Sequence, residues 1–182
     1  MPGLKFRILL DTKKNEEIFH DILIADGEDF ETFFQTIIKS FEFKGDQMAS
    51  FYVSNETWDK GEEISLLDLS EGEESQVQIM KDTKVRDHLL DRDQKFILVY
   101  DFLKMWIFYL ELIEINKEDS NYAYPHVTLN FGDSPDENSK MIPDLTDGMT
   151  HEKSLEDDIN DVFNEFNEDE FGSFDNIDDY DF

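Results

Sequence analysis

The sequence predicts an α+β fold, in which a β-hairpin is followed by an amphipathic helix and then by further strands. Three observations lead to this prediction. Residues 5–10 and 18–25 are apolar runs rich in β-branched side chains, and a polar insert at residues 12–17 joins them. Phe and Ile then recur at helical spacing. Two long apolar runs of strand character follow at residues 96–100 and 106–115.

The helix is predicted from the spacing of its apolar side chains. They recur every three or four residues along one face, at Phe30, Phe33, Phe34, Ile37, Ile38 and Phe41. Asp26 or Asp29 is the expected N-cap, because a short carboxylate can accept hydrogen bonds from the first free N–H groups. Gly45 is the expected stop, since glycine readily adopts the left-handed conformation that ends helices.

Beyond the helix, strand character recurs in several runs. Strands are expected at residues 49–53, 96–100 and 106–115, with a short strand within 62–69 and brief extended pieces at 77–80 and 127–131. A small helix is expected from Asp82 or Thr83, with Val85 and Leu89 on its inner face. The order of hairpin, crossing helix and mixed or antiparallel strands suggests a β-grasp-like arrangement.

The chain divides into three parts by composition. Residues 1–117 form the expected globular domain, which extends to about residue 131 if the last apolar piece belongs to it. Residues 118–150 read as a polar linker with scattered Pro and Gly. Residues 151–182 hold 13 of the 45 acidic residues but only one Lys, with Phe and Tyr interspersed. Such a tail is too charged to form a core, so we expect it to be mostly disordered until it meets a partner.

Composition excludes several classes of function. A net charge of −29 disfavours direct binding to nucleic acid, which needs clustered Lys and Arg, and it opposes self-association, so a monomer is expected. The chain has no Cys, which excludes disulfides and cysteine-ligated metals. No signal-peptide pattern is seen at the N-terminus, so a cytoplasmic location is expected. The apolar stretch 96–115 is not a membrane helix, because Asp101, Lys104, Glu111 and Glu114 interrupt it.

No constellation of residues predicts a reaction. The four His residues are scattered, carboxylates are too abundant for an acid–base pair to be singled out, and no nucleophile elbow or phosphate loop occurs. Residues 131–138 are rich in oxygen ligands but lack the spacing of a calcium loop. We therefore predict a protein that is not an enzyme and that carries no cofactor or metal.

Two features suggest contact with another protein. Trp58 lies in a polar loop, where it either covers an edge of the core or anchors a partner. In the tail, apolar residues over 155–166 have helical spacing and can form an amphipathic helix, which docks on a partner or on its own domain. The candidate partner-binding residues are Trp58, Leu155, Ile159, Phe163, Phe166, Phe171, Phe174 and Tyr180.

Residues 5–115 also resemble a known protein family. The residues that carry the likeness are 18–24, 29–31, 37, 41–43, 48–53, 96–102 and Trp106. The family was first named from the third open reading frame of an Ri plasmid. The resemblance implies a small α+β protein found on plasmids and beside transposable elements, with no established activity. Where many members read Asp-Phe-Gly-Asp-Ser-Trp, this chain has Leu103, Lys104 and Met105 in place of Gly, Asp and Ser. The Cys-rich end common in relatives is also absent.

These observations lead to one main hypothesis and two alternatives. The main hypothesis is a non-enzymatic protein-interaction module with a disordered acidic-aromatic tail, acting as an accessory to a plasmid or mobile element. Its unknown partner is expected to offer a basic or hydrophobic groove. The first alternative is an acidic mimic of nucleic acid that occupies the basic groove of a DNA-binding protein. The second is hydrolysis at a carboxylate site, which only the abundance of acids supports.

Overall fold

The computed structural model describes residues 2–70, 77–117 and 123–141. The chain divides into two units, Met1–Met141 and Ile142–Phe182, and the second lies outside the described residues. The elements of the first are β1 (Gly3–Leu10), β2 (Phe19–Ala25), α1 (Phe30–Ser40), β3 (Ala49–Ser54), β4 (Glu63–Ser65), β5 (Gln78–Ile79), the 3₁₀ helices η1 (Met80–Asp82) and η2 (Val85–His88), β6 (Lys95–Tyr100), β7 (Trp106–Asn116), β8 (His126–Phe131) and the 3₁₀ helix η3 (Glu137–Ser139).

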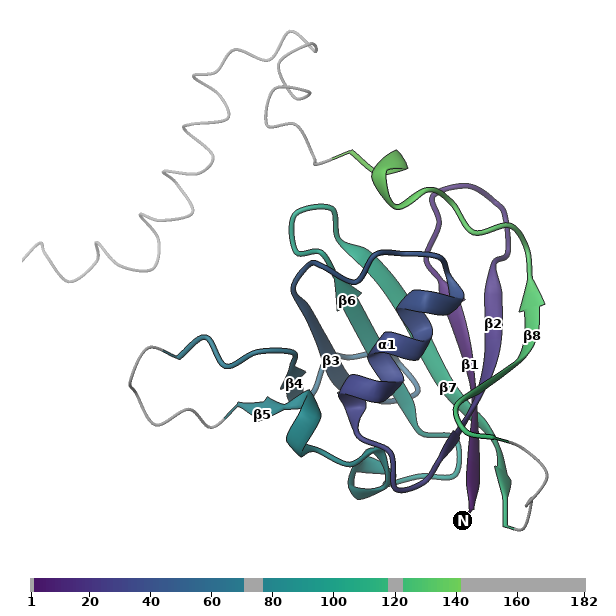
Figure 1. Cartoon of the computed structure of the whole chain (residues 1–182), viewed down its shortest axis with the longest axis vertical. Coiled ribbons are helices and arrows are strands. Elements are labelled where there is room, and N and C mark those ends of the chain that lie inside the picture. The colour runs from purple at the N-terminus through teal and green to yellow at the C-terminus, as the bar shows by residue number, and fades with distance from the viewer. Residues whose placement is uncertain (1, 71–76, 118–122, 142–182) are drawn as a thin grey trace, which may run out of the picture. The chain divides into compact units, whose positions relative to one another are not determined.

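A single mixed sheet dominates the fold. Its eight strands have the order β5-β4-β3-β6-β7-β1-β2-β8, and all pairings except the parallel β4–β5 pair are antiparallel. Helix α1 lies across one face of this sheet (Figure 1). The predicted hairpin, crossing helix and antiparallel strands are confirmed. The structure is more sheet-rich than an evenly balanced α+β fold, and the central strands β1 and β7 run antiparallel, so the β-grasp-like arrangement is not the observed topology.

The core fills the space between α1 and the sheet. Strand β1 sends alternate side chains inward, and the β1–β2 register pairs Phe6 with Ile22. The inward-facing residues of β6 and β7 belong to the same core, and each is at most 4% exposed. Because α1 presents Phe30, Phe33 and Phe34 to this surface, the core is built largely from aromatic rings in contact.

The caps of α1 explain where it begins and ends. The Asp29 carboxylate accepts a 2.7 Å hydrogen bond from the Thr32 N–H, so Asp29 is the N-cap. At the other end the Phe43 N–H bonds the Ile38 carbonyl and the Glu42 N–H bonds that of Lys39. This is a Schellman motif, in which Glu42 occupies the left-handed position with φ of 61°. The helix therefore stops before Gly45, and the prediction that Gly45 ends it is wrong.

The shorter elements agree with the sequence-based expectation in part. Strand β4 is the short strand expected within residues 62–69, whereas the expected small helix is a pair of 3₁₀ turns, η1 and η2. The extended piece expected at 127–131 forms strand β8, which pairs with β2. Beyond β8, in the stretch that the sequence suggests as linker, Glu137 is buried at 8% exposure.

Candidate interaction surface

The sheet face opposite α1 carries a continuous row of apolar side chains. Cross-strand pairing joins Tyr52 to Ile97, Ile97 to Tyr109, Tyr109 to Leu9, Leu9 to Phe19 and Phe19 to Phe131. Tyr52, Ile97, Tyr109, Leu9 and Phe19 point away from α1, because each has a strand neighbour that belongs to the core cluster. Phe131 lies on the same side, since its ring stacks on that of Phe19. In the part of the chain that the structure describes, no helix crosses this side. We call the row, together with Leu129 on β8, the open face.

The open face becomes more exposed toward β8. Ile97 on β6 is only 3% exposed, whereas Leu9 is 38%, Leu129 44% and Phe131 49% exposed. The rings of Phe19 and Phe131 stack with their centroids 5.0 Å apart. Contiguous exposed apolar side chains of this kind are rare on a monomer and usually mark an interaction site.

A charged row runs beside the apolar one. Arg7 donates two hydrogen bonds to Asp21, at 2.8 and 2.9 Å, and its guanidinium lies 4.5 Å from the centroid of the Phe19 ring. The hydrogen bonds to Asp21 raise the pKa of Arg7. Lys95 forms an ion pair with Glu111 at 3.5 Å. Each of these two ion pairs carries no net charge.

Trp58 belongs to this face and not to the core. Its ring meets Tyr109 edge-on, with centroids 5.0 Å apart, and the Lys95 ammonium lies 5.8 Å from its centre. The loop is built around Asn55, whose side-chain oxygen accepts hydrogen bonds from the N–H groups of Thr57 and Asp59. Trp58 itself has φ of 59°, a strained conformation for a bulky residue. The loop thus holds a half-buried Trp over the β6–β7 end of the open face.

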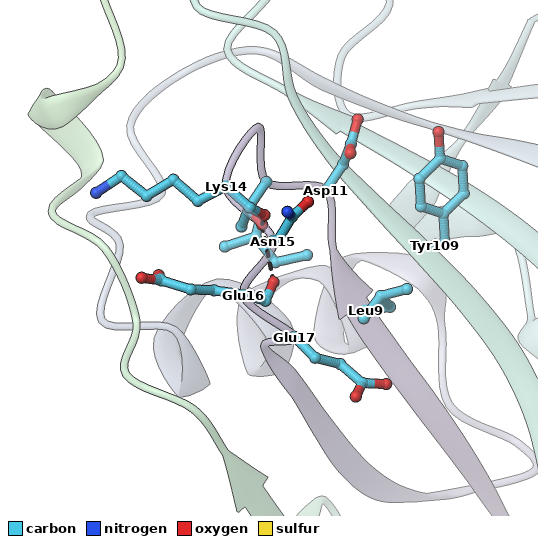
Figure 2. A pocket seen from close by; sticks show the side chains of 9 residues that line it. Leu9, Asp11, Lys14, Asn15, Glu16, Glu17 and Tyr109 are labelled. Carbon is cyan, nitrogen blue, oxygen red and sulfur yellow. Dashed lines mark hydrogen bonds between the residues drawn. The ribbon is translucent and has the colours of Figure 1, made fainter.

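A hollow adjoins the open face where the β1–β2 loop folds back (Figure 2). It has a volume of about 370 Å³, and residues 9–12, 14–17 and Tyr109 line it. The Thr12 hydroxyl fixes the loop, since it lies 2.9 Å from the carbonyl oxygens of both Lys14 and Glu16. Burial and the nearby Asp11 carboxylate raise the pKa of Tyr109. The hollow therefore combines an apolar wall with acidic side chains.

A second hollow lies between α1 and β8, and it adjoins the pair Ser40 and His20. The hollow is lined by polar residues of α1, by Pro125 and by Val127. His20 Nδ1 lies 3.0 Å from Ser40 Oγ, but the Ser40 hydroxyl donates to the Ile37 carbonyl, and the His20 ring stacks on Phe41. Burial lowers the pKa of His20. This is the geometry of a core histidine held by a helix, and it offers no activated nucleophile.

Three other sequence-based predictions concern metal binding, membrane insertion and the tail. Among the described residues no cluster of three or more His, Asp and Glu side chains is arranged to hold a metal ion. The helices of the same residues include none long and apolar enough to cross a membrane. The tail residues Leu155, Ile159, Phe163, Phe166, Phe171, Phe174 and Tyr180 lie outside the described residues. Of the predicted partner-binding residues, the structure therefore places Trp58.

The β6–β7 turn, where this chain differs from the motif of the resembling family, is held by Asp101. Its carboxylate accepts hydrogen bonds from the N–H groups of Leu103 and Lys104, both at 3.1 Å. Asp101 and Met105 both have positive φ, of 59° and 57°. The retained Asp thus has a structural role in the turn, and the exposed Phe102 and Leu103 form its tip.

Comparisons with known proteins place this fold. No curated protein matches the chain. The structure is similar to the crystal structure of a protein of unknown function, MM3350, from Methanosarcina mazei Go1, with a TM-score of 0.66 and 16% sequence identity. The match covers 78% of this chain and 76% of the other, and at this identity it shows the fold alone. A family model described as "Plasmid pRiA4b ORF-3-like protein" matches residues 2–179. The chain therefore belongs to the plasmid pRiA4b ORF-3-like family, as its resemblance implied.

Proposed function

We propose that this protein is a non-enzymatic interaction module that binds a partner protein through the open face. The observation that carries the proposal is the row Leu9, Phe19 and Phe131, with Leu129 beside it. These apolar side chains are partly exposed on the sheet and continuous over three strands. Burying such side chains contributes about 25 cal/mol per Å² of apolar area, so a partner that covers the row gains stability.

Two features add to the proposal. Trp58 extends the open face with the kind of large aromatic anchor that dominates binding energy at protein interfaces. The acidic-aromatic tail supplies a second binding element through Leu155, Phe163 and the other tail residues named above. Since the family takes its name from a plasmid reading frame, we propose that the protein is an accessory to a plasmid or mobile element. We propose that it acts inside the cell.

The experiment compares partner capture by four forms of the protein. One carries Leu129→Thr and Phe131→Thr, which remove apolar surface from the open face and place β-branched residues, which favour strands, in β8. The matched control carries Leu67→Thr and Leu90→Thr, which are 55% and 78% exposed away from that face. The other two are the wild type and a truncation to residues 1–150.

The expected result is loss of the captured protein with the open-face variant and its retention with the control, at equal thermal stability of both. Loss with the truncation alone would assign binding to the tail. Capture that is unchanged in the open-face variant would overturn the role of the open face.

The acidic nucleic-acid mimic is the second candidate, because the net charge is −29. A mimic would compete with DNA for a basic groove, and its binding would weaken steeply as salt rises. Binding through the open face depends on apolar burial, so its affinity changes little between 50 mM and 500 mM salt. The salt dependence of the captured complex decides between the two.

A further inference from the structure

We propose that strand β8 receives an extended segment of the partner protein, which adds to the sheet as a further strand beside it. This inference rests on the proposed function and states how the partner segment is held and which side chains it carries. The segment directs apolar side chains toward the open face and a carboxylate toward Lys39, on the opposite face of the sheet. The edge, the composition and the surroundings of β8 favour this occupant.

The outer edge of β8 is placed for pairing with another chain. Strand β8 is the last in the sheet order and lies at the rim of the sheet in Figure 1. The chain that follows it turns back across the end of the sheet, where Glu137 bonds Tyr100 of β6. Among the described residues, β2 is the only strand paired with β8. In an antiparallel edge strand every second residue directs its N–H and C=O groups outward, where an added chain can pair with them.

The composition of β8 does not discourage such pairing. Edge strands commonly carry Lys or Pro, which keep other chains away. Residues 127–131 read Val-Thr-Leu-Asn-Phe and contain neither, although charged residues make up 34% of the chain. The register shifts at Thr128, whose hydroxyl donates a 3.2 Å hydrogen bond to the Asp21 carbonyl, and residues 129–131 then follow β2 in regular register. An uncharged edge in so acidic a chain favours the addition of a strand.

Both faces of the sheet beside β8 have room for side chains. On the open face, Leu129 and Phe131 are 44% and 49% exposed. On the α1 face lies the second hollow, which has a volume of about 500 Å³ and includes Val127 in its lining. Successive side chains of a strand alternate between the two faces, so an added strand places one set beside Leu129 and Phe131 and the other beside Val127. A helix presents one apolar stripe and would fill only one of these spaces.

The second hollow determines the polar side chains of the added segment. The wall that α1 contributes consists of Thr32, Gln35, Thr36, Lys39 and Ser40. The hydroxyls of Thr36 and Ser40 donate to carbonyls of their own helix. Lys39 is the only charged residue of the lining, and none of the salt bridges of the described residues engages it. A carboxylate of the partner segment therefore complements this hollow.

A second copy of this chain is a less favourable occupant of the edge. Two chains that each carry a net charge of −29 repel one another. In addition, residues 127–131 of a second copy offer no carboxylate to Lys39. A partner segment with a single acidic residue meets neither obstacle.

The test selects peptides that bind the immobilised full chain from a phage library of random seven-residue sequences. The expected peptides alternate apolar and polar residues, with Asp or Glu among the polar ones. The synthetic form of the most enriched peptide should cause saturable shifts of the amides of residues 127–131 in the ¹⁵N-labelled full chain. It should also slow hydrogen exchange at least tenfold at alternate amides of β8. No enrichment, enriched peptides without alternation, or unchanged signals of residues 127–131 would overturn the proposal.

Backbone N-methylation of the selected peptide tests the strand pairing itself. Methylation of the peptide N–H groups that face β8, which are every second one, should weaken binding at least tenfold because each loses a hydrogen bond to the edge. Methylation of the intervening N–H groups should leave binding nearly unchanged. Equal weakening at all positions, or at none, would reject an added strand.

Substitution of Lys39 tests the second hollow. Lys39→Gln should weaken binding of the selected peptide about two- to fivefold, as expected for one exposed ion pair. Replacing the acid of the peptide by its amide should then have no further effect. The control, Lys81→Gln, removes an exposed cation that does not line the hollow and should leave binding unchanged. Equal weakening in both variants would show a general charge effect and reject the carboxylate at Lys39.

Failure of the added strand is distinguishable from failure of the proposed function. If partner capture depends on Leu129 and Phe131 but slows exchange at no amide of β8, the interaction module stands and the added strand is rejected. If β8 binds the alternating peptides while Leu129→Thr with Phe131→Thr leaves partner capture unchanged, the strand site stands and the role of the open face is rejected. A dimer of the full chain in sedimentation, with alternate amides of β8 protected, would assign the edge to a second copy and overturn the proposal.

Discussion

Removal of the Glu137 side chain should destabilise the protein strongly, because this residue fastens the last described segment to the end of the sheet. Its carboxylate accepts a 2.5 Å hydrogen bond from the Tyr100 hydroxyl and a 2.9 Å bond from the Lys44 N–H. Its backbone carbonyl accepts a 3.2 Å bond from the Trp106 indole. Tyr100 is fully buried and Glu137 is 8% exposed.

The expected magnitude follows from the groups left without a partner. In Glu137→Ala the Tyr100 hydroxyl keeps only the Asp46 carboxylate, at 3.5 Å, as an acceptor, and a buried donor without a good partner costs about 1–3 kcal/mol. The Lys44 N–H also loses its acceptor, but Lys44 is exposed, so water can take the place of the carboxylate. Because the Gly45 N–H still bonds the Tyr100 oxygen at 3.0 Å, we expect a loss of about 2 kcal/mol. The indole bond persists, since it uses the main chain. Glu137→Gln keeps an acceptor oxygen and should lose about half as much.

The assay is urea unfolding of the full chain, followed by near-ultraviolet circular dichroism. Asp133→Ala, which removes an exposed carboxylate from the same segment, is the control and should change the unfolding free energy by less than about 0.5 kcal/mol. A double-mutant cycle with Tyr100→Phe should show coupling of about 1–3 kcal/mol. A loss below about 1 kcal/mol for Glu137→Ala, or no coupling, would refute the view that this segment is fastened to the body.

Four further predictions concern the body of the protein. Burial, together with the hydrogen bond to Glu137, raises the pKa of Tyr100. The stability that the protonated phenol contributes is therefore complete below about pH 10 and is lost as pH rises further. Tyr100→Phe should flatten the alkaline part of a plot of unfolding free energy against pH. Burial lowers the pKa of His20, so stability is present above about pH 6.5 and declines as pH falls, and His20→Gln should remove that slope. Glu42→Gly relieves a left-handed non-glycine residue and should raise the unfolding free energy by about 1 kcal/mol in urea, whereas no change would refute the strain. Arg7→Gln leaves the Asp21 carboxylate, whose side chain is only 4% exposed, without its bidentate partner. The unfolding free energy should fall by about 2 kcal/mol. An unchanged unfolding free energy would show that water replaces the guanidinium.

The local elements of the fold follow from sequence because their signals are local. The stripe at Phe30, Phe33 and Phe34 predicts α1, since helical spacing needs no knowledge of the partner surface. The end of α1 was predicted wrongly because the left-handed residue that closes the helix is Glu42, whereas Gly45, which also has a positive φ, lies three residues further on. The Schellman hydrogen bonds stabilise that exception, and composition alone gives no sign of it.

The open face depends on strand order, which the sequence does not reveal. Leu9 reads as part of an apolar core strand, and its outward direction becomes meaningful only once Tyr109 and Phe19 are known as its neighbours. Residues 127–131 are expected to be extended, but the sequence does not show that β2 is the strand with which they pair. Trp58 could be singled out from its polar surroundings. Its position over Tyr109 could not, since the two are far apart in the chain.

The most direct test of the account is methyl NMR of the full chain in complex with its captured partner. Binding through the open face predicts that the Leu9 and Leu129 methyl signals broaden or shift, while those of Ile37 and Ile38 on the buried side of α1 stay in place. Perturbations confined to residues 151–182, with the Leu9 and Leu129 signals unchanged, would contradict the central claim.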